Sequence, residues 1–383
     1  MSEYQYLEFL AVDCPLTDRE MDHLRGISTR AQITPISFIN EYSWGGLKAD
    51  PRDFMRHFFD VHVFIANWGD AIFMVRLPKE AIDQKTLKAF CTSPHLGFEK
   101  LPEHWLLTWS LGETEDYDRF GYVDEGPGLM TLLAPLREEL LRGDLRSLYI
   151  GWLRAVTTEE PDPDDLEPLA LHGLNKLTTA QQSLAKFLEV DIDLLAGVGY
   201  GSQTNQTDAA DDGALDAWLD NLPKTEVRGY LCQMLDGQGA SAERALKRRH
   251  AAWQEQSSLT KGVRRSVDEL WQLTEQAKGL RLIEEAKLRR QAEAERKRQR
   301  DSWLAKLAAD FPQAWIATND DAKKGHAHAY DAACRQLVDL RDAYSQHATL
   351  AAFQKEFQKF MAEHLRRHSL VQRLVKAGFW RDK

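Results

Sequence analysis

Residues 61–77 read VHVFIANWGDAIFMVRL, and this stretch decides the fold of the N-terminal part of the chain. Two runs rich in β-branched and aromatic residues, Val61–Asn67 and Ala71–Leu77, flank the short segment Trp68-Gly69-Asp70. Strand-forming runs joined by a short glycine-containing segment are typical of a β-hairpin. The stretch therefore predicts two strands connected by a tight turn.

The segments around this hairpin predict strands and helices in alternation. Three segments have the composition expected of further strands: Tyr4–Val12, Thr34–Glu41 and Trp105–Leu111. A short helix is expected to begin at Asp13 or Thr17, and another after Asp50-Pro51, where an N-cap residue precedes proline. We therefore predict that residues 1–128 form an α+β domain, a small sheet with helices on one face.

From residue 129 onward the pattern becomes helical. Apolar residues at helical spacing predict helices in six segments: 129–141, 145–156, 179–188, 191–195, 215–222 and 226–235. Residues 197–213, GVGYGSQTNQTDAADDG, have no apolar pattern, so we expect a flexible linker there. The sequence predicts a helical domain over residues 129–240.

The two halves of the chain carry opposite charge. Residues 1–240 contain 20 lysines and arginines against 40 acidic residues, whereas residues 241–383 contain 29 against 19. Between Gly262 and Ala309 no proline interrupts the chain, which predicts one long helix of about 70 Å. We therefore expect a long basic helical region over residues 241–310. A helical C-terminal domain is expected over 311–383, with helices near 330–344, 350–368 and 370–378.

The basic region is the strongest functional signal. Cations presented along an extended helix can neutralise phosphates or contact an acidic protein surface, including the acidic half of this same chain. A solvated helix with interspersed acids is the alternative interpretation. The candidate binding residues are Arg248, Arg249, Arg264, Arg265, Arg289, Arg290, Arg296, Lys297, Arg298 and Arg300.

Other motifs point to no cofactor. Gly197–Gly201 has the glycines of a phosphate-binding loop but lacks its lysine. His364 and His368 share a predicted helix face, but the arginines between them oppose a metal ion. The four cysteines form no CxxC pair. We expect neither a metal site nor a cofactor.

A cluster near the hairpin raises a catalytic alternative. Arg56, His57, Asp60 and His62 lie around the end of a predicted helix. A histidine near a carboxylate can act as a general acid or base. No GxSxG nucleophile motif accompanies the cluster. An enzyme with an N-terminal His/Asp site is therefore only the second alternative.

Several segments resemble known proteins. YQYLEFLAVDCPLT at 4–17, RAQITPISFINEYSWGGLKADP at 30–51 and LREELLRGDLRSLYIGWL at 136–153 resemble a family of uncharacterised bacterial proteins. The tail, with YDAA at 330–333, LVDLRD at 337–342 and VKAG at 375–378, is similar to the helical region that follows the finger in bacterial SWIM zinc-finger proteins. This resemblance implies work with nucleic acid or in a protein complex. The CxC and CxH motifs of the finger are absent, so its metal and its binding role are not carried over.

These observations predict a non-enzymatic adaptor or scaffold protein that acts in a bacterial complex through its basic helix and helical surfaces. We expect a protein partner or self-association, which the apolar positions around Trp271 favour. Nucleic-acid binding through residues 241–300 is the first alternative. No run approaches the ~20 apolar residues that span a bilayer, and the N-terminus lacks the basic region of a signal peptide. A cytoplasmic location without membrane contact is expected, and no small-molecule substrate is identified.

Overall fold

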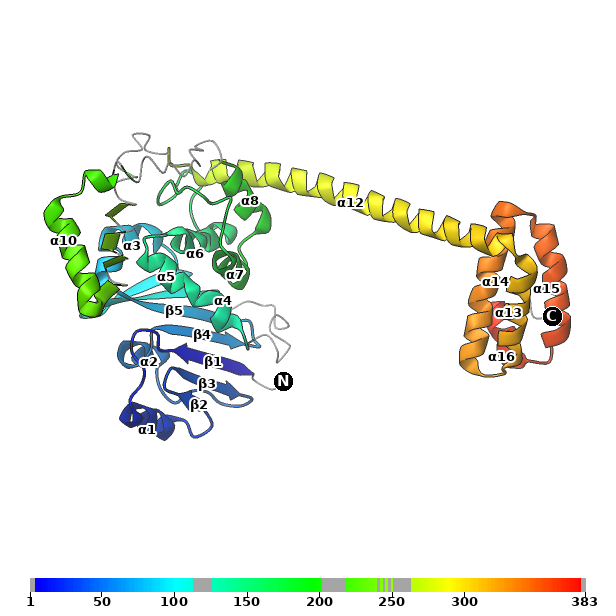
Figure 1. Cartoon of the computed structure of the whole chain (residues 1–383), viewed down its shortest axis with the longest axis horizontal. Helices are drawn as coiled ribbons and strands as arrows, with labels where there is room; N and C mark the ends of the chain where they lie inside the picture. Colours follow the sequence, from blue (N-terminus) through cyan, green and yellow to red (C-terminus); the bar gives the residue numbers. More distant parts are fainter. Residues whose placement is uncertain are drawn as a thin grey trace. The chain divides into compact units, whose positions relative to one another are not determined.

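The structure is a computed structural model that describes residues 4–112, 126–201, 216, 218–239, 242–243, 245–246, 249–250 and 263–379. The chain divides into two compact units, residues 1–281 (unit 1) and residues 282–383 (unit 2). Unit 1 contains a β-sheet with short helices, and unit 2 is helical (Figure 1). The predicted fold class is confirmed: an α+β N-terminal part is followed by a predominantly helical body with one long helix.

A seven-stranded antiparallel sheet forms the centre of unit 1. Its strands are β1 (Gln5–Leu10), β2 (Gln32–Thr34), β3 (Ser37–Tyr42), β4 (Val61–Ala66), β5 (Ala71–Pro78), β6 (Leu96–Lys100) and β7 (His104–Ser110). They lie in the order β2-β3-β1-β4-β5-β7-β6. The predicted hairpin is confirmed as β4 and β5, paired from Val61 with Val75 to Ile65 with Ala71. Gly69 has a φ of 92° in the turn, a conformation that a larger residue would adopt only with strain.

The sheet is larger than the sequence predicts. The strand expected over Thr34–Glu41 is in fact two strands, β2 and β3, because Pro35 and Ile36 form a turn between them. Strand β6 and helix α3 (Gln84–Phe90) were not predicted. The expectation of helices on one face is wrong, because apolar side chains point to both sides of the sheet and helices cover both.

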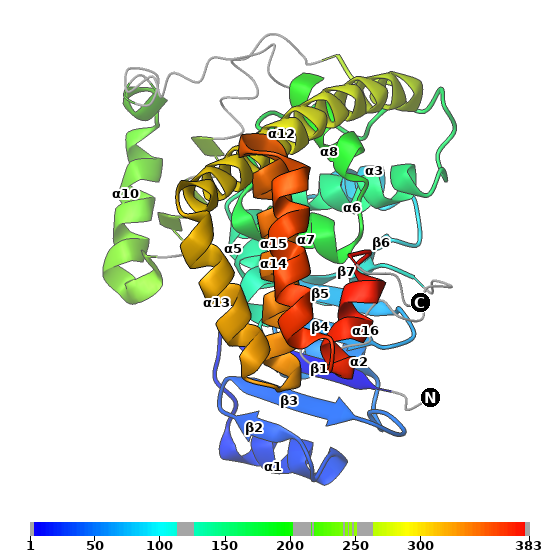
Figure 2. The ribbon, with the colours of Figure 1, turned by 90° about the vertical axis from the view of Figure 1, so that its right-hand side faces the viewer.

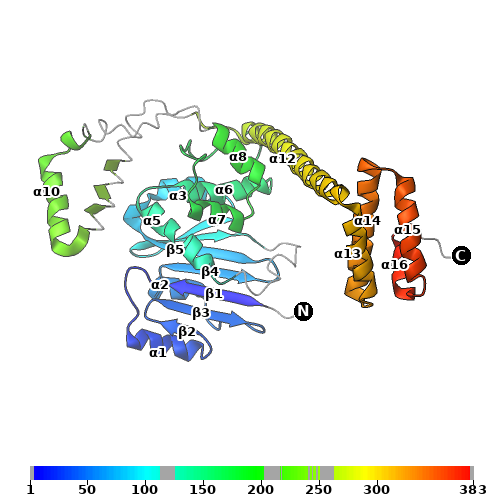
Figure 3. The ribbon, with the colours of Figure 1, turned by 45° about the vertical axis from the view of Figure 1, so that its right-hand side comes forward.

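Helices α1 (Asp18–Ile27) and α2 (Pro51–His57) cover one face of the sheet (Figure 3). Both begin where the sequence predicts a cap. Thr17 forms a capping box with Glu20, and Asp50 accepts a hydrogen bond from the backbone N–H of Arg52. The core beneath them is aromatic and contains Phe9, Phe38, Phe54 and Phe59.

On the opposite face, helices of the described residues form a second core together with the start of the long helix that follows them. They are α3, α4 (Leu129–Leu133), α5 (Pro135–Leu141), α6 (Arg146–Thr157), α7 (Thr179–Phe187) and α8 (Ile192–Gly201). The helix expected over 129–141 is divided into α4 and α5 at Pro135, which lacks a backbone donor. Trp109 of β7 donates a hydrogen bond from Nε1 to the Ser147 carbonyl of α6 (3.0 Å). One core thus extends from the sheet into these helices, across the domain boundary predicted near residue 128.

The glycine-rich run at 197–201 is helical, contrary to the linker expected there. It forms the end of α8, and the rest of the expected linker, from residue 202, lies outside the described residues. A Cβ atom at Gly197 would lie 2.7 Å from the backbone carbonyl of Leu273. The small residue therefore lets α8 approach the backbone of the next long helix closely. Sequence pattern alone does not distinguish such a contact from a flexible segment.

The long helix α12 (Val267–Ala309) begins in unit 1 and ends in unit 2. In unit 2 it is followed by α13 (Phe311–Lys323), α14 (Ala327–His347), α15 (Leu350–His364) and α16 (His368–Lys376). Figure 2 shows these four helices gathered into a bundle, in which α14 contacts each of the other three. Its core contains Leu337, Leu340, Phe353, Phe357, Phe360 and Leu370. Unit 1 also contains η1 (Lys79–Ala81), α10 (Lys224–Gln233) and a π-helical turn, η3 (Met234–Gln238).

The contact at Gly197 predicts opposite effects for two glycine-to-alanine variants. Gly197→Ala should lower the free energy of unfolding by about 1–3 kcal/mol, because the added methyl meets helix backbone that cannot rotate away. Gly279→Ala is the matched control in α12. No atom lies within 4 Å of its added Cβ, so it should stabilise by about 0.5–1 kcal/mol. Chemical denaturation measures both, and equal stability of the two variants would contradict the close approach.

Candidate functional site

The ten cations predicted to bind a partner have different surroundings in the structure. Arg248 lies outside the described residues. Arg249 pairs with Glu226 of α10 (3.0 Å). Arg264 donates hydrogen bonds to the backbone carbonyls of Leu166 and Glu167. Arg249 and Arg264 therefore contact residues of unit 1 itself.

Arg265 takes part in a buried ion pair. Its Nε donates to Oε1 of Glu167 (3.0 Å) and its Nη2 to Oε2 (2.9 Å), while the Tyr149 hydroxyl also donates to Oε2. Glu167 is 1 % exposed and Tyr149 is fully buried. Burial, followed by the charge of Glu167, raises the pKa of Tyr149 well above its ordinary value, so its hydroxyl keeps the proton that it donates.

This ion pair fixes the start of α12. Beside it, Val267 donates its backbone N–H to the Asp165 carbonyl (2.9 Å), and Leu166 forms a β-bridge with Ser266. The chain before α12 is thus attached to the loop that follows α6. Arg264 and Arg265 are therefore structural residues, and the expectation that they face a partner is not supported. Counting charges along the sequence could not separate them from exposed arginines.

Removing one partner of this ion pair should lower the free energy of unfolding substantially. Glu167→Gln leaves the Arg265 guanidinium without its counter-ion, and loss of a buried partner typically costs about 3–5 kcal/mol. Glu284→Gln is the control, because its pair with Lys287 is exposed and should contribute less than about 1 kcal/mol. Urea unfolding of both variants tests this. A Glu167→Gln variant as stable as the control would show that the buried pair does not hold α12.

Arg300 is also occupied. In unit 2 its Nη1 lies 2.5 Å from Oδ1 of Asp339, and its Nη2 lies 2.8 Å from Oδ2 of Asp342. The hydrogen bonds that Arg300 donates to the carboxylates of Asp342 and Asp339 raise its pKa above the ordinary value. Both acids lie on α14, so Arg300 joins α12 to the bundle.

Five of the predicted cations remain exposed and form no ion pair within the described residues: Arg289, Arg290, Arg296, Lys297 and Arg298. Seven residues make about two helical turns, so Arg296 follows Arg289 on one face and Lys297 follows Arg290 beside it. Arg298 lies nine residues after Arg289, on the opposite side of the helix. Four of the five cations therefore form a single strip.

Apolar side chains extend this strip at both ends. Leu282 and Ile283 precede Arg289 and Arg290 by seven residues, and Trp303 follows Arg296 by seven. They are 50 %, 67 % and 52 % exposed. The stripe of α12 is defined here as Leu282, Ile283, Arg289, Arg290, Arg296, Lys297 and Trp303. Sequence analysis found the cations but did not connect these apolar side chains with them, which a seven-residue spacing could have indicated.

The N-terminal residues suggested for catalysis have unrelated surroundings. His57 is exposed at the end of α2, and Arg56 pairs with Asp53 and Glu99. His62 is buried between strands and packs on Phe9 (3.9 Å between ring centres). The predicted cluster is therefore not assembled around one reaction centre.

Asp60 belongs to a buried charge network at the ends of the central strands β1, β4 and β5. It accepts hydrogen bonds from the backbone N–H groups of Val12 (2.7 Å) and Asp13 (2.9 Å) and from Arg76 (2.8 Å). Arg137 of α5, 3 % exposed, donates to Asp13 (2.6 Å) and to the Arg76 carbonyl (2.9 Å). Burial alone would raise the pKa of Asp60, but these donors and cations hold it below the ordinary value. The network joins α5 to the sheet.

His62 makes stability depend on pH. Its Nδ1 lies 3.0 Å from the Glu8 carbonyl, and its Nε2 has no partner among the described residues. Burial lowers the pKa of His62 from 6.5 to about 3. Between these values the unfolded chain binds a proton that the folded chain does not, so the free energy of unfolding falls as the pH falls.

His62→Phe should make this pH dependence shallower. One such histidine contributes a slope of about 1.4 kcal/mol per pH unit, and phenylalanine removes it. The measurement is urea unfolding at several pH values between 6 and 4, above the ordinary pKa of Asp60. His57→Phe, at an exposed site, is the matched control. Equal slopes in the wild type and His62→Phe would contradict the buried neutral imidazole.

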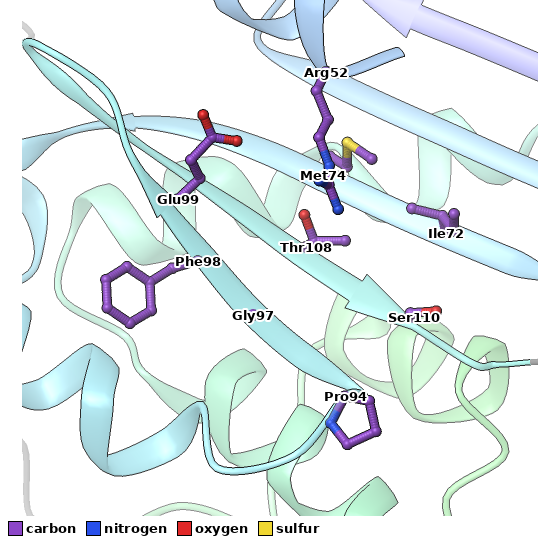
Figure 4. Close-up of a pocket in the computed structure, with 9 residues that line it drawn as sticks. All are labelled: Arg52, Ile72, Met74, Pro94, Gly97, Phe98, Glu99, Thr108 and Ser110. Atoms are coloured by element: carbon purple, nitrogen blue, oxygen red, sulfur yellow. The ribbon is translucent and has the colours of Figure 1, made fainter. Parts of the chain in front are cut away.

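A pocket of about 420 Å³ lies on the sheet face that α1 and α2 cover in part (Figure 4). It lies over strands β5, β7 and β6, and Arg52 reaches over it from α2. Its lining residues are Arg52, Ile72, Met74, Pro94, Gly97, Phe98, Glu99, Thr108 and Ser110. Neither His57 nor Asp60 lines it.

The described residues contain no group of three or more His, Cys, Asp or Glu side chains arranged to hold a metal ion. In the same part of the chain, no helix has the length and apolar character needed to cross a bilayer. No protein-family model, curated protein or solved structure matches the chain. The similarity of the tail to SWIM-finger proteins stays a prediction.

Proposed function

We propose that this protein is a non-enzymatic adaptor that binds an acidic protein surface through the stripe of α12. The observation that carries the proposal is the unpaired cationic strip bordered by exposed apolar side chains. The partner surface would present carboxylates between two apolar contacts. We place this complex in the bacterial cytoplasm, a location consistent with four cysteines that are all unpaired.

The mixed composition of the stripe favours a protein over a nucleic acid. Arginine and tryptophan are enriched in protein interfaces and often contribute most of the binding energy. Leu282, Ile283 and Trp303 offer apolar area that a phosphate backbone would not cover. Glu293 lies four residues from both Arg289 and Lys297, on the same side of α12.

The charge distribution supports the same proposal. Unit 2 contains 20 lysines and arginines against 14 acidic residues, whereas unit 1 contains 29 against 45. An acidic partner would therefore be attracted to the stripe and repelled by much of unit 1. Such a pattern directs a partner to one region of the chain.

Photo-crosslinking tests the proposed surface directly. A photoactivatable benzophenone amino acid is introduced at position 293, within the stripe, or at position 295, on the other side of α12. In cells that produce the protein natively, position 293 should give a discrete protein adduct and position 295 should not. Adducts that are destroyed by nuclease, or the same adducts from both positions, would contradict an acidic protein partner at this face.

Charge reversal in the stripe should weaken the complex. The variant R289E/R290E/R296E/K297E should reduce the crosslinked adduct at least tenfold, because each reversed charge removes about 0.5–1 kcal/mol. The matched control R335E/K355E/R366E/K376E reverses four exposed cations of the bundle and changes the net charge equally. An equal loss in both variants would show that only the net charge of unit 2 matters.

A salt titration with oligonucleotides tests the alternative that the partner of the stripe is a nucleic acid. Fluorescence polarisation of the full-length protein with labelled single-stranded and duplex oligonucleotides, from 50 to 300 mM salt, should show weak binding at 50 mM. Tight binding that falls steeply with salt, and that is lost in R289E/R290E/R296E/K297E, would instead identify a nucleic-acid arm.

A further inference from the structure

The pocket of unit 1 exists because two helices cover only part of a seven-stranded sheet. Helix α1 contacts β2 and helix α2 contacts β5, and the aromatic core beneath them includes Phe9 of β1 and Phe38 of β3. Alternation along the strands directs Ile72 and Met74 of β5, and Thr108 and Ser110 of β7, to the same face. Helix α2 contacts β5, where Met74 is buried, whereas Ile72, Thr108 and Ser110 are only half-buried, and a hollow of about 420 Å³ lies there beside α2.

Arg52 supplies the hollow with a positive charge. Its side chain descends from α2 toward Met74 and Thr108 (Figure 4). Its guanidinium forms no ion pair within the described residues, whereas Arg56, one turn later, pairs with both Asp53 and Glu99. Because Arg56 already bridges the Glu99 carboxylate at the rim, Arg52 is the cation that remains for a ligand.

Gly97 keeps the hollow open on the side of β6. A Cβ atom built at this residue would meet no other atom within 4 Å, so the space beside it is unfilled. The remaining surface is amphipathic. Ile72, Met74 and Pro94 provide apolar contact, and the Thr108 and Ser110 hydroxyls provide hydrogen-bonding groups.

We propose that this pocket binds a small organic molecule that carries one carboxylate on an apolar body. The carboxylate would pair with the planar guanidinium of Arg52, which can donate two parallel hydrogen bonds. The apolar body would lie on Ile72 and Met74, with the Thr108 hydroxyl in reach of the polar end. One cation and an apolar floor suit a monoanion better than a phosphate ester. A volume of about 420 Å³ is within the range of small-molecule sites.

Methyl NMR of the full-length protein tests the proposal. The probes are phenylacetate and its neutral counterpart phenylacetamide, and the reporters are the methyl groups of Ile72 and Met74. Phenylacetate should shift both methyl signals with saturation and leave the core methyls of Met130 and Ile150 unchanged. Phenylacetamide should bind at least about tenfold more weakly, because a charge-assisted hydrogen bond is lost. No shift at Ile72 and Met74, or equal affinity for both probes, would overturn the proposal.

Two variants identify the residues responsible. Arg52→Gln should weaken phenylacetate binding at least about tenfold, whereas the control Arg19→Gln, an exposed arginine on α1, should not. Gly97→Val fills the hollow and should abolish binding without lowering the unfolding temperature, because the new side chain enters empty space in a strand. Unchanged binding in Arg52→Gln or in a folded Gly97→Val would overturn the assignment.

Discussion

The buried ion pair between Glu167 and Arg265 is the interaction on which the arrangement of α12 depends. A charge pair out of water is retained only when each group has close partners, and here Tyr149 and the Val198 carbonyl complete the set. The pair fixes the residue at which α12 begins. Because a helix has a fixed rotation per residue, that start also sets which side chains of the next two turns face the core, among them Val267 and Leu270. Burial then ends: Ala277 is the last buried residue of α12 before Leu304.

The sheet of unit 1 follows from a different constraint, the apolar character of both its faces. Along β5, Phe73 and Val75 belong to one core and Met74 to the other, so neither face can be left in water without cost. Helices α3 to α8 and the start of α12 build the core on one face. The two short helices on the other face bury its aromatic half. Over β7 that face becomes polar with Thr108 and Ser110, next to the hollow.

Much of the fold could be predicted from local sequence. The hairpin of β4 and β5, the caps at Thr17 and Asp50 and the long α12 all depend on residues within a few positions of one another. Features that depend on distant partners were missed or wrongly predicted. Gly197 has the composition of a linker, and only Leu273, far along the chain, explains its place in a helix. The same holds for the candidate cations. A charge count treats Arg265 and Arg289 alike, and only the three-dimensional position of Glu167 shows that Arg265 is buried in an ion pair.

The exposed apolar members of the stripe are the part of α12 that helix stability does not explain. Alanine, glutamate, lysine and glutamine have helix propensities equal to or better than those of isoleucine and tryptophan, and they do not expose apolar area. A helix that stood in water alone would gain from such a residue at position 283, whereas Trp303 also donates a hydrogen bond to Asp339 of α14 (3.3 Å). The neighbouring cations likewise obtain no ion pair within the described residues that would offset the entropy of ordering them. A surface of matching composition would offset both costs, and the proposed binding to an acidic protein surface supplies one.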